Sequence, residues 1–258
     1  MAYAGASVNT AGGDPVDPKW FETFFDSDDW LLVAEQRDEE RTQAEVDFVA
    51  GRLPAGARVL DVPCGTGRIS VPLAARGFTV AGLDIAEPVL ARARVAGPGL
   101  EFRQGDMREL PWPDASFDAV LNLWTAFGYF ETQDEDERVL AEFARVLAPG
   151  GVVVLDTVNQ LALVRGFRPK SFEEVDGIVF LQEHAYDQVT GRSSAHWSFL
   201  RGGRRSELSF DHRLYTTPEY VDMFRRAGLE PEAFYGGFSG EELGWDTWRQ
   251  IIVARKST

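Results

Sequence analysis

Short runs of apolar residues alternate along the chain with segments whose apolar residues recur at helical spacing. The first run surrounds Leu60, and a helical pattern begins near Ile69. Several runs are apolar at nearly every position, which is typical of parallel strands that helices cover on both faces. We therefore expect seven strands, at residues 58–62, 79–84, 100–104, 117–123, 152–158, 229–235 and 247–255.

Capping and turn residues mark the helices between these strands. Gly77 stops the helix that begins at Arg68, and Pro88 suits the first turn of the next helix. Thr132 and Glu135 form a capping box in front of an amphipathic segment. The pattern predicts a doubly wound α/β fold whose Rossmann-like, seven-stranded sheet is mostly parallel, with one antiparallel strand near the end. Further helices are expected at residues 35–52 and 217–228.

Residues 172–215 do not follow this pattern. Three segments within them, 178–186, 192–200 and 204–215, read as strands joined by links that carry turn residues. We interpret this region as a small antiparallel β insert that forms a lid. The predicted division of the chain is a flexible segment 1–17, an α/β domain of residues 18–171 and 216–258, and the insert.

Near the start of the chain, Trp20, Phe21, Phe24 and Phe25 cluster at helical spacing. One interpretation is an N-terminal helix docked on the core. The other is a cap that covers a binding site. The sequence leaves both open.

Residues 58–68 read RVLDVPCGTGR, a short buried strand with Asp61 near its end, then Gly65 and Gly67, then the start of a helix. The glycines let the backbone turn sharply and approach a ligand, and the free N–H groups of a helix start favour a carboxylate or phosphate. Asp84 ends the second predicted strand, where an acid typically holds the two hydroxyls of a ribose.

The chain of 258 residues is acidic, with a net charge of −15 and a pI of about 4.7. This charge argues against nucleic acid or an anionic membrane as the main partner. The single cysteine, Cys64, excludes an intramolecular disulfide and suggests a cytoplasmic protein. We interpret Cys64 as a packed residue rather than a nucleophile. The three histidines have no metal-ligand spacing, so no metal site is expected.

Five motifs identify a resemblance: VLDVPCGTGR from Val59, GLD ending at Asp84, GDMRELPW from Gly105, FDAVLNLWTAFGYF from Phe117 and LAPGGVVVLD from Leu147. In this order they resemble the class I S-adenosylmethionine-dependent methyltransferases of the small-molecule type, including the amino-sugar N,N-dimethyltransferases. The likeness is strongest over residues 54–158. Pro63 stands where many members carry Gly, and Ala86 where a capping Ser is common, and neither changes the cofactor that the resemblance implies.

The resemblance implies S-adenosyl-L-methionine as cofactor. Asp106 would accept a hydrogen bond from the adenine amino group, and Met107 would present its backbone N–H to the ring. Residues 122–124 would lie near the sulfonium. The Asn-Leu-Trp-Thr sequence that starts at Asn122 is not the tetrad of many nucleic-acid base methylating enzymes. The implied cofactor-binding residues are Asp61, Pro63, Gly65, Thr66, Gly67, Asp84, Ile85, Asp106, Met107, Asn122, Leu123 and Trp124. Arg37 and Arg41 are either solvated or contacts of the cofactor carboxylate.

The implied reaction is an in-line displacement that moves a methyl group to an N or O of a small-molecule acceptor and leaves S-adenosyl-L-homocysteine. Two alternatives stay open. A nicotinamide-dependent oxidoreductase is disfavoured, because Ser70 occupies the third position of the GxGxxG frame. The other is a catalytically silent, cofactor-binding regulator with the same fold.

Strand alternation selects two histidines as candidate catalytic residues. His212 shares a face with Leu208 and Phe210, and His184 shares one with Phe180. Such a histidine either packs in a core or faces the acceptor, where it would titrate near neutrality and take a proton. His196 has polar neighbours on its face and is expected to be solvated. The edges of the insert also predict a possible homodimer.

Overall fold

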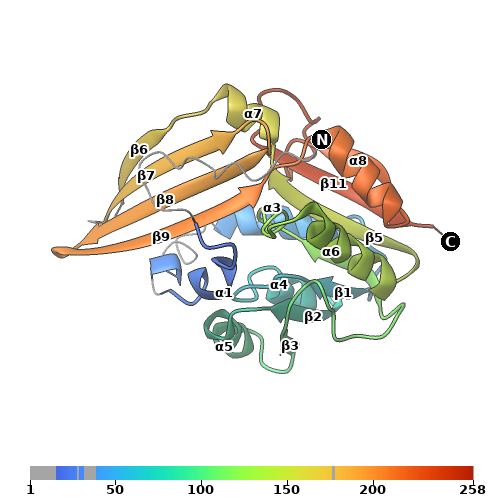
Figure 1. The fold of residues 1–258 in the computed structure, drawn as a ribbon. Helices are drawn as coiled ribbons and strands as arrows, with labels where there is room; N and C mark the ends of the chain where they lie inside the picture. Colours follow the sequence, from blue (N-terminus) through green and yellow to red (C-terminus); the bar gives the residue numbers. More distant parts are fainter. Residues whose placement is uncertain (1–15, 28, 32–38, 176–177, 258) are drawn as a thin grey trace.

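The computed structural model describes residues 16–27, 29–31, 39–175 and 178–257. It contains two sheets (Figure 1), and the larger has the strand order β10-β11-β5-β4-β1-β2-β3. The first 15 residues of the segment predicted to be flexible, and Arg37, lie outside the described residues. The larger sheet consists of β1 (Arg58–Asp61), β2 (Thr79–Asp84), β3 (Glu101–Gln104), β4 (Phe117–Asn122), β5 (Leu147–Val158), β10 (Leu229–Tyr235) and β11 (Arg249–Lys256).

The predicted fold class is confirmed. β1 pairs in parallel with β2 and β4, and β4 pairs in parallel with β5. β11 is antiparallel to both of its neighbours, β5 and β10. The carboxyl ends of β1, β2, β3, β4 and β5 therefore meet at one edge of the sheet, where ligands of this fold bind.

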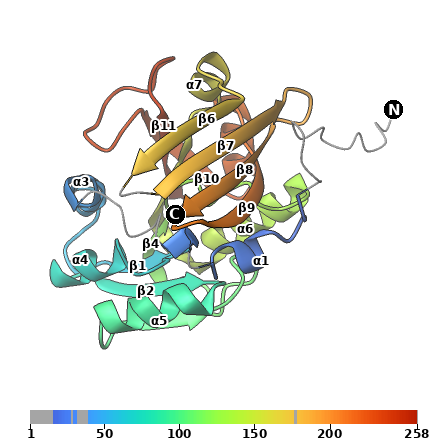
Figure 2. The same cartoon turned by 90° about the vertical axis from the view of Figure 1, so that its left-hand side faces the viewer.

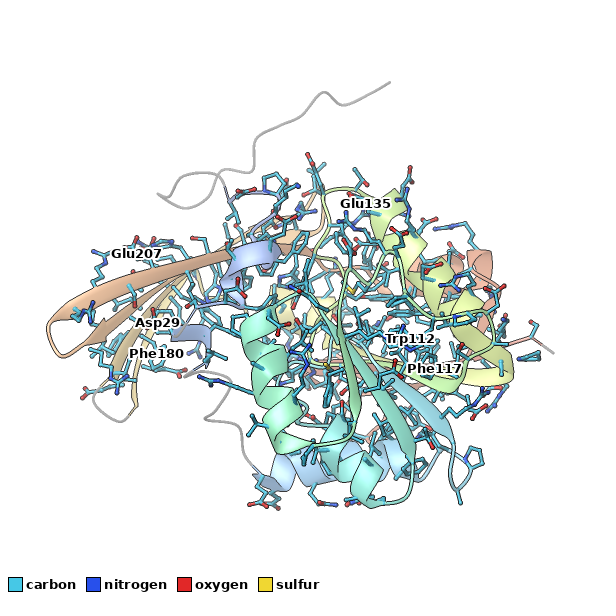
Figure 3. The ribbon with its side chains drawn as sticks, turned by 90° about the horizontal axis from the view of Figure 1, so that it is seen from below. Asp29, Trp112, Phe117, Glu135, Phe180 and Glu207 are labelled. Carbon is cyan, nitrogen blue, oxygen red and sulfur yellow. The ribbon has the colours of Figure 1, made fainter. Side chains whose placement is uncertain are left out.

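Helices cover both faces of this sheet. α3 and α4 pack on one face and α6 and α8 on the other, while α5 packs on β2 and β3. Both α6 and α8 begin with capping boxes, at Thr132 and at Thr216. Trp112 and Phe117 lie in contact inside this domain, with ring centroids 5.5 Å apart (Figure 3). The helices are α3 (Glu39–Ala50), α4 (Ser70–Ala75), α5 (Glu87–Ala96), α6 (Gln133–Val146) and α8 (Thr217–Arg226).

The insert is a separate antiparallel sheet of four strands, in the order β6-β7-β8-β9. It projects from the α/β domain (Figures 1 and 3), and its strands face the viewer in Figure 2. Glu207 lies toward its far end (Figure 3). The three predicted strands are present, and a fourth was missed. The strands are β6 (Lys170–Val175), β7 (Ile178–Asp187), β8 (Arg192–Arg201) and β9 (Arg204–Arg213).

The sequence analysis missed β6 because its residues, KSFEEV, carry no clear alternation and become a strand by pairing with β7. The short helix α7 (Gln160–Arg165) was missed as well. Its start is fixed by Asn159, whose side chain accepts a hydrogen bond from the N–H of Leu161.

The aromatic segment near the N-terminus forms the short helix α1 (Phe21–Phe24), which lies between the two sheets (Figure 1). Its Phe24 packs edge-on against Phe210 of β9, at 5.7 Å between ring centroids. Trp20 contacts the same ring at 5.9 Å. Among the described residues, no helix combines the length and the apolar character needed to cross a membrane.

Candidate active site

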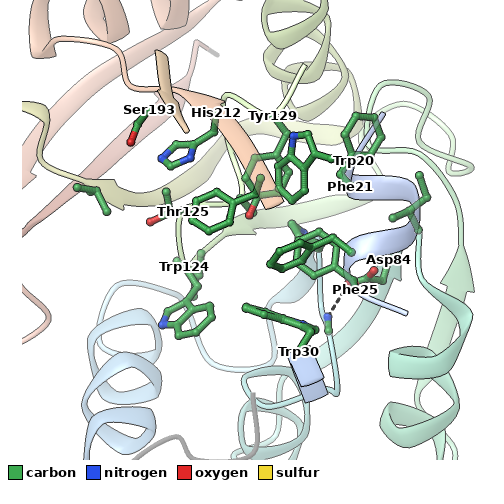
Figure 4. A pocket seen from close by; sticks show the side chains of 18 of the residues that line it. Trp20, Phe21, Phe25, Trp30, Asp84, Trp124, Thr125, Tyr129, Ser193 and His212 are labelled. Carbon is green, nitrogen blue, oxygen red and sulfur yellow. Dashed lines mark hydrogen bonds between the residues drawn. The ribbon is translucent and has the colours of Figure 1, made fainter. Parts of the chain in front are cut away.

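A cavity of about 600 Å³ lies between the carboxyl ends of the parallel strands, the insert and α1. Asp84 lies at one end of it and Ser193 and His212 at the other, with Trp30 and Trp124 along the way (Figure 4). We call these the glycine end and the insert end. One continuous space can therefore hold two ligands side by side.

The glycine end is built by the turn between β1 and α4. Gly65 has a φ of +55°, and its N–H donates to Oδ2 of Asp84 at 2.8 Å. The N–H of Ala86 donates to Oδ1 of Asp84 at 3.0 Å. A Cβ added to Gly65 would meet no atom within 4 Å. Because Gly65 lines the cavity, that free space is open to a ligand.

The glycine end contains two buried carboxyl groups whose pKa values are raised. Burial raises the pKa of Asp84 to about 6, against the opposing effect of the hydrogen bonds from Ala86 and Gly65. Burial also raises the pKa of Asp61 to about 7, although Oγ of Ser70 donates to it at 2.6 Å. The thiol of Cys64 lies beside them, and burial raises its pKa well above the usual value. The thiol is therefore protonated, as expected of a packed residue.

Ten of the twelve predicted cofactor-binding residues line the cavity, and Gly67 and Asn122 do not. A Cβ at Gly67 would lie 3.3 Å from Phe102 and 3.4 Å from Ala93, so a side chain there would press on α5 and β3 rather than enter the cavity. Gly67 is required by its φ of +79° and by packing against α5. Asn122 is fully buried and donates to the carbonyl of Val62 at 2.8 Å, where it holds β4 to β1.

Asp106 lines the cavity but has a strong partner of its own. Nη2 of Arg108 lies 2.6 Å from its Oδ2, and the N–H of Arg108 donates to its Oδ1 at 2.8 Å. Arg108 also reaches Glu135 at 2.6 Å, which links the loop after β3 to α6. Met107 is buried at the cavity wall. The carboxylate of Asp106 is thus oriented before any ligand binds.

The sequence analysis missed Arg68, the last residue of the glycine motif. Arg68 lines the cavity, and its Nη1 lies 2.5 Å from the buried Glu45 of α3. Its Nε is buried with no hydrogen-bond partner among the described residues. Arg41 instead points to Glu45, at 3.1 Å. Among the described residues, Arg68 therefore pairs with Glu45 and keeps one N–H group, at Nε, without a partner beside the glycine end.

Aromatic side chains form the middle of the cavity. Trp30 packs on Trp124 at 5.7 Å between ring centroids, and Trp20 packs on Tyr129 at 4.8 Å. Phe25 stacks on Tyr129 at 6.1 Å. All five rings line the cavity (Figure 4), so the N-terminal aromatic segment covers it as a cap.

The inner face of the insert closes the far end. Ser193 of β8 pairs with His212 of β9, and both are buried at the cavity wall. His184 lines the same end and lies 3.4 Å from Oε1 of Gln182. His196 lies on the opposite face, 2.8 Å from Oγ of Ser209. The predicted alternation of faces is therefore confirmed.

The expectation that His212 titrates near neutrality is wrong. Its pKa is lowered to about 4, mainly by burial and also by the charge of Arg192 and the neighbouring His184. Both of its ring nitrogens are buried without a hydrogen-bond partner among the described residues. Burial lowers the pKa of His184 as well. Both imidazoles are therefore neutral at physiological pH.

The chain is similar in sequence to known proteins. A family model described as a methyltransferase domain matches residues 59–151. The chain is 30% identical to a dTDP-3-amino-3,4,6-trideoxy-α-D-glucopyranose N,N-dimethyltransferase of Streptomyces venezuelae, over 76% of this chain and 85% of that protein.

Two of the similar solved structures cover most of this chain. The CcbJ methyltransferase of Streptomyces caelestis superposes with a TM-score of 0.82, at 24% identity, over 92% of this chain and 99% of that chain. The S-adenosylmethionine-bound amino pentose methyltransferase CalS10 of Micromonospora echinaspora gives a TM-score of 0.66 at 27% identity, over 89% of this chain and 96% of that chain.

Proposed function

This chain belongs to the class I S-adenosylmethionine-dependent methyltransferases that modify small molecules, and we propose that its acceptor is an amine that binds in the neutral form. Three steps support the proposal. They are the fit of the cofactor to the glycine end, the chemistry that the middle of the cavity permits, and the lack of a suitable base among the described residues of the insert end.

The residues of the glycine end fit S-adenosylmethionine. The carboxylate of Asp84, anchored by two backbone N–H groups, has the acceptor capacity for two ribose hydroxyls. The buried, unpartnered Nε of Arg68 suits the methionine carboxylate. Asp106 and Met107 follow β3, where the adenine is expected. When bound, the cofactor supplies a methyl group on a sulfonium, so the leaving group is already activated.

The protein's own tasks are then alignment and exclusion of water. The aromatic rings of Trp20, Phe25, Trp30, Trp124 and Tyr129 form an apolar wall around the middle of the cavity. Ring faces also attract a cation, which suits the ammonium that forms when an amine nitrogen bonds to the methyl carbon.

The observation that carries the amine assignment is the distribution of acids and bases. Among the described residues that line the cavity, the carboxylates are Asp61, Asp84 and Asp106, and all three lie at the glycine end. His184 and His212 at the insert end are weak bases. An alcohol needs a base to remove its proton, whereas a neutral amine already presents a lone pair.

A matched acceptor panel tests this proposal. Purified protein is incubated with methyl-labelled S-adenosylmethionine and with pairs that differ in one atom: benzylamine and benzyl alcohol, cyclohexylamine and cyclohexanol, and the dTDP-3-amino sugar of the Streptomyces venezuelae relative with its 3-hydroxy counterpart. We expect label on amines only. Label on the hydroxyl members in preference to the amines would contradict the proposal.

His212 is proposed to bind the acceptor as a neutral hydrogen-bonding group. His212→Asn is then expected to slow methyl transfer about tenfold, the effect of one lost hydrogen bond. Cofactor affinity stays unchanged, and the pH–rate profiles of both proteins have the same shape above pH 5. If His212 were a general base, the loss would be about a hundredfold or more and an inflection would vanish from the profile.

We also propose a homodimer in which the inserts meet. Among the described strands, β6 pairs only with β7, so it forms an edge of the second sheet, and such edges are usually covered. Its Phe172 is 74% exposed. Sedimentation at micromolar concentration is expected to show a dimer, and a sample that stays monomeric would remove this part of the proposal.

The absence of nucleic-acid or membrane partners remains a prediction from the net charge, and a cytoplasmic location remains a prediction from the single Cys64.

A further inference from the structure

The turn that follows β4 has an unusual backbone. Trp124 has a φ of +70° and Thr125 a φ of +63°, and neither residue is a glycine. A left-handed conformation is unfavourable for side chains with a Cβ, and most of all for a β-branched threonine. Two such residues in a row persist only where the surrounding structure holds them, and they occur most often at functional sites.

Asp156 of β5 holds this turn through two backbone hydrogen bonds. The N–H of Trp124 donates to its Oδ2 at 2.8 Å, and the N–H of Thr125 donates to its backbone carbonyl at 2.9 Å. Asp156 is completely buried. A buried carboxylate is costly unless it is paired with a cation.

Arg249 of β11 supplies that cation. Its Nε lies 2.7 Å from Oδ1 of Asp156 and its Nη2 lies 2.5 Å from Oδ2, a two-point pairing. Its Nη1 donates to Oγ1 of Thr125 at 3.0 Å. β11 runs beside β5, which brings Arg249 to this point although it is 124 residues away in sequence from Thr125. The pair therefore fixes both the backbone and the side chain of the turn.

This arrangement leaves the Thr125 hydroxyl with a defined bonding capacity. A guanidinium has donors only, so Oγ1 of Thr125 must accept from Arg249. One lone pair and the hydroxyl hydrogen then remain, and neither has a partner among the described residues. Thr125 lines the cavity between Trp124 and His212 (Figure 4), at the boundary of the glycine and insert ends.

We propose that Asp156 and Arg249 are positioning residues that hold Thr125 against the acceptor, and that Thr125 orients the nucleophile. The Thr125 contact rests on the proposed function: an N–H of the neutral amine donates to the remaining lone pair of Oγ1. The nitrogen lone pair is then free to form the new bond to the methyl carbon, and the electron pair of the breaking carbon–sulfur bond would stay on the sulfur. The methylated product would leave as an ammonium that keeps its proton, so no base is needed in the site. Because the charges of Asp156 and Arg249 cancel, the acceptor meets a neutral surface.

The first arm of the test measures the turn without any acceptor. Hydrogen exchange is followed in peptides that cover residues 122–128 in the wild type, in Arg249→Met and Arg249→Lys, and in Arg255→Met. Arg255 is the matched control, because it also lies on β11 and pairs with Glu232 at 2.7 Å, away from the cavity. We expect the amides of Trp124 and Thr125 to exchange about tenfold faster in Arg249→Met than in the wild type. The increase in Arg249→Lys should be smaller, because lysine keeps the charge.

Unchanged exchange in Arg249→Met would overturn the positioning role. If Arg249→Met does not fold, judged by near-ultraviolet circular dichroism, Arg249→Lys and Asp156→Asn decide by the same exchange measurement. Arg255→Met is expected to exchange as the wild type does. Equal loosening of the turn in that variant would also contradict a specific role for Arg249.

The second arm measures Thr125 in the labelled-methyl assay with the panel amines. Thr125→Val is expected to lower kcat/KM for the amine about tenfold, with affinity for S-adenosylhomocysteine within about twofold of wild type. Thr125→Ser keeps the hydroxyl and is expected to have the kcat/KM of the wild type. Full activity of Thr125→Val overturns the Thr125 contact. Absence of transfer to any amine by the wild type overturns the proposed function and this contact with it, whereas the exchange result still decides on Asp156 and Arg249.

Discussion

Gly65→Val is expected to weaken the binding of S-adenosylmethionine by about a hundredfold or more. Gly65 lines the cavity, and an added Cβ would project into open space that the cofactor needs. The fold should tolerate the change, because the added atom meets no protein atom within 4 Å. The cost to folding is the left-handed backbone at φ +55°, about 1–2 kcal/mol for a residue with a Cβ.

Gly67→Val is the matched control for this prediction. It adds the same side chain two residues later at a similar φ of +79°, but the Cβ would press on Phe102, Ala93 and Val71 instead of entering the cavity. Calorimetric titration and thermal unfolding of both variants separate the effects. We expect Gly65→Val to lose binding and keep most of its stability, and Gly67→Val to lose more stability. Normal binding by Gly65→Val would show that the turn does not cradle the cofactor.

Asp84→Ala is expected to weaken S-adenosylmethionine by at least tenfold. Each hydrogen bond from a ribose hydroxyl to the carboxylate contributes about 1.5–3 kcal/mol, and about 1.4 kcal/mol is tenfold in affinity. Asp84 also accepts the N–H groups of Gly65 and Ala86, so the variant loses part of the turn's support. Asp84→Asn keeps the shape of the side chain and serves as the control. Unchanged calorimetric affinity in both variants would contradict the assignment.

The raised pKa of Asp84 adds a pH dependence to the same experiment. Its ionised form accepts the hydroxyls, and its pKa in the free protein is about 6. Affinity should therefore be full above this pH and fall by about tenfold for each unit below it. The stability of the cofactor-free protein changes with pH in the opposite direction. Because the pKa of Asp84 is raised in the folded state, the stability that this group contributes is full below its ordinary pKa of 3.8 and is lost as pH rises through 6. In Asp84→Asn the fall of cofactor affinity below pH 6 should disappear. If the affinity still falls at low pH in that variant, the titrating group would be Asp61.

The sequence predicted the α/β domain well because its signals are local. Buried parallel strands are apolar throughout, and the helix starts at Thr132 and Pro88 are marked by capping chemistry. The glycine end was predictable for the same reason, since Asp61, Gly65 and Asp84 belong to motifs that end their strands. The roles of Gly67 and Asn122 were not predictable, because each depends on which side of the turn a neighbouring element packs.

The insert end depends on long-range contacts, and sequence reasoning reached it only in part. Alternation placed His184 and His212 on the inner face of the insert, but burial sets the pKa of His212, and burial is a property of the packed structure. Arg249 lies in a strand with no motif and becomes significant only beside Asp156. The positive φ values of Trp124 and Thr125 could not be predicted from the residue types. Tryptophan and threonine are uncommon in that conformation, so neither residue indicates a left-handed turn.

The structure of a complex with S-adenosylhomocysteine tests the central claim most directly. The account predicts that the ribose hydroxyls contact Asp84, that the carboxylate lies by Arg68, and that the sulfur faces the turn at Trp124 and Thr125. The space from Thr125 to His212 should remain free for the amine. A cofactor whose adenosine occupies the insert end, or whose sulfur faces away from Thr125, would contradict the account.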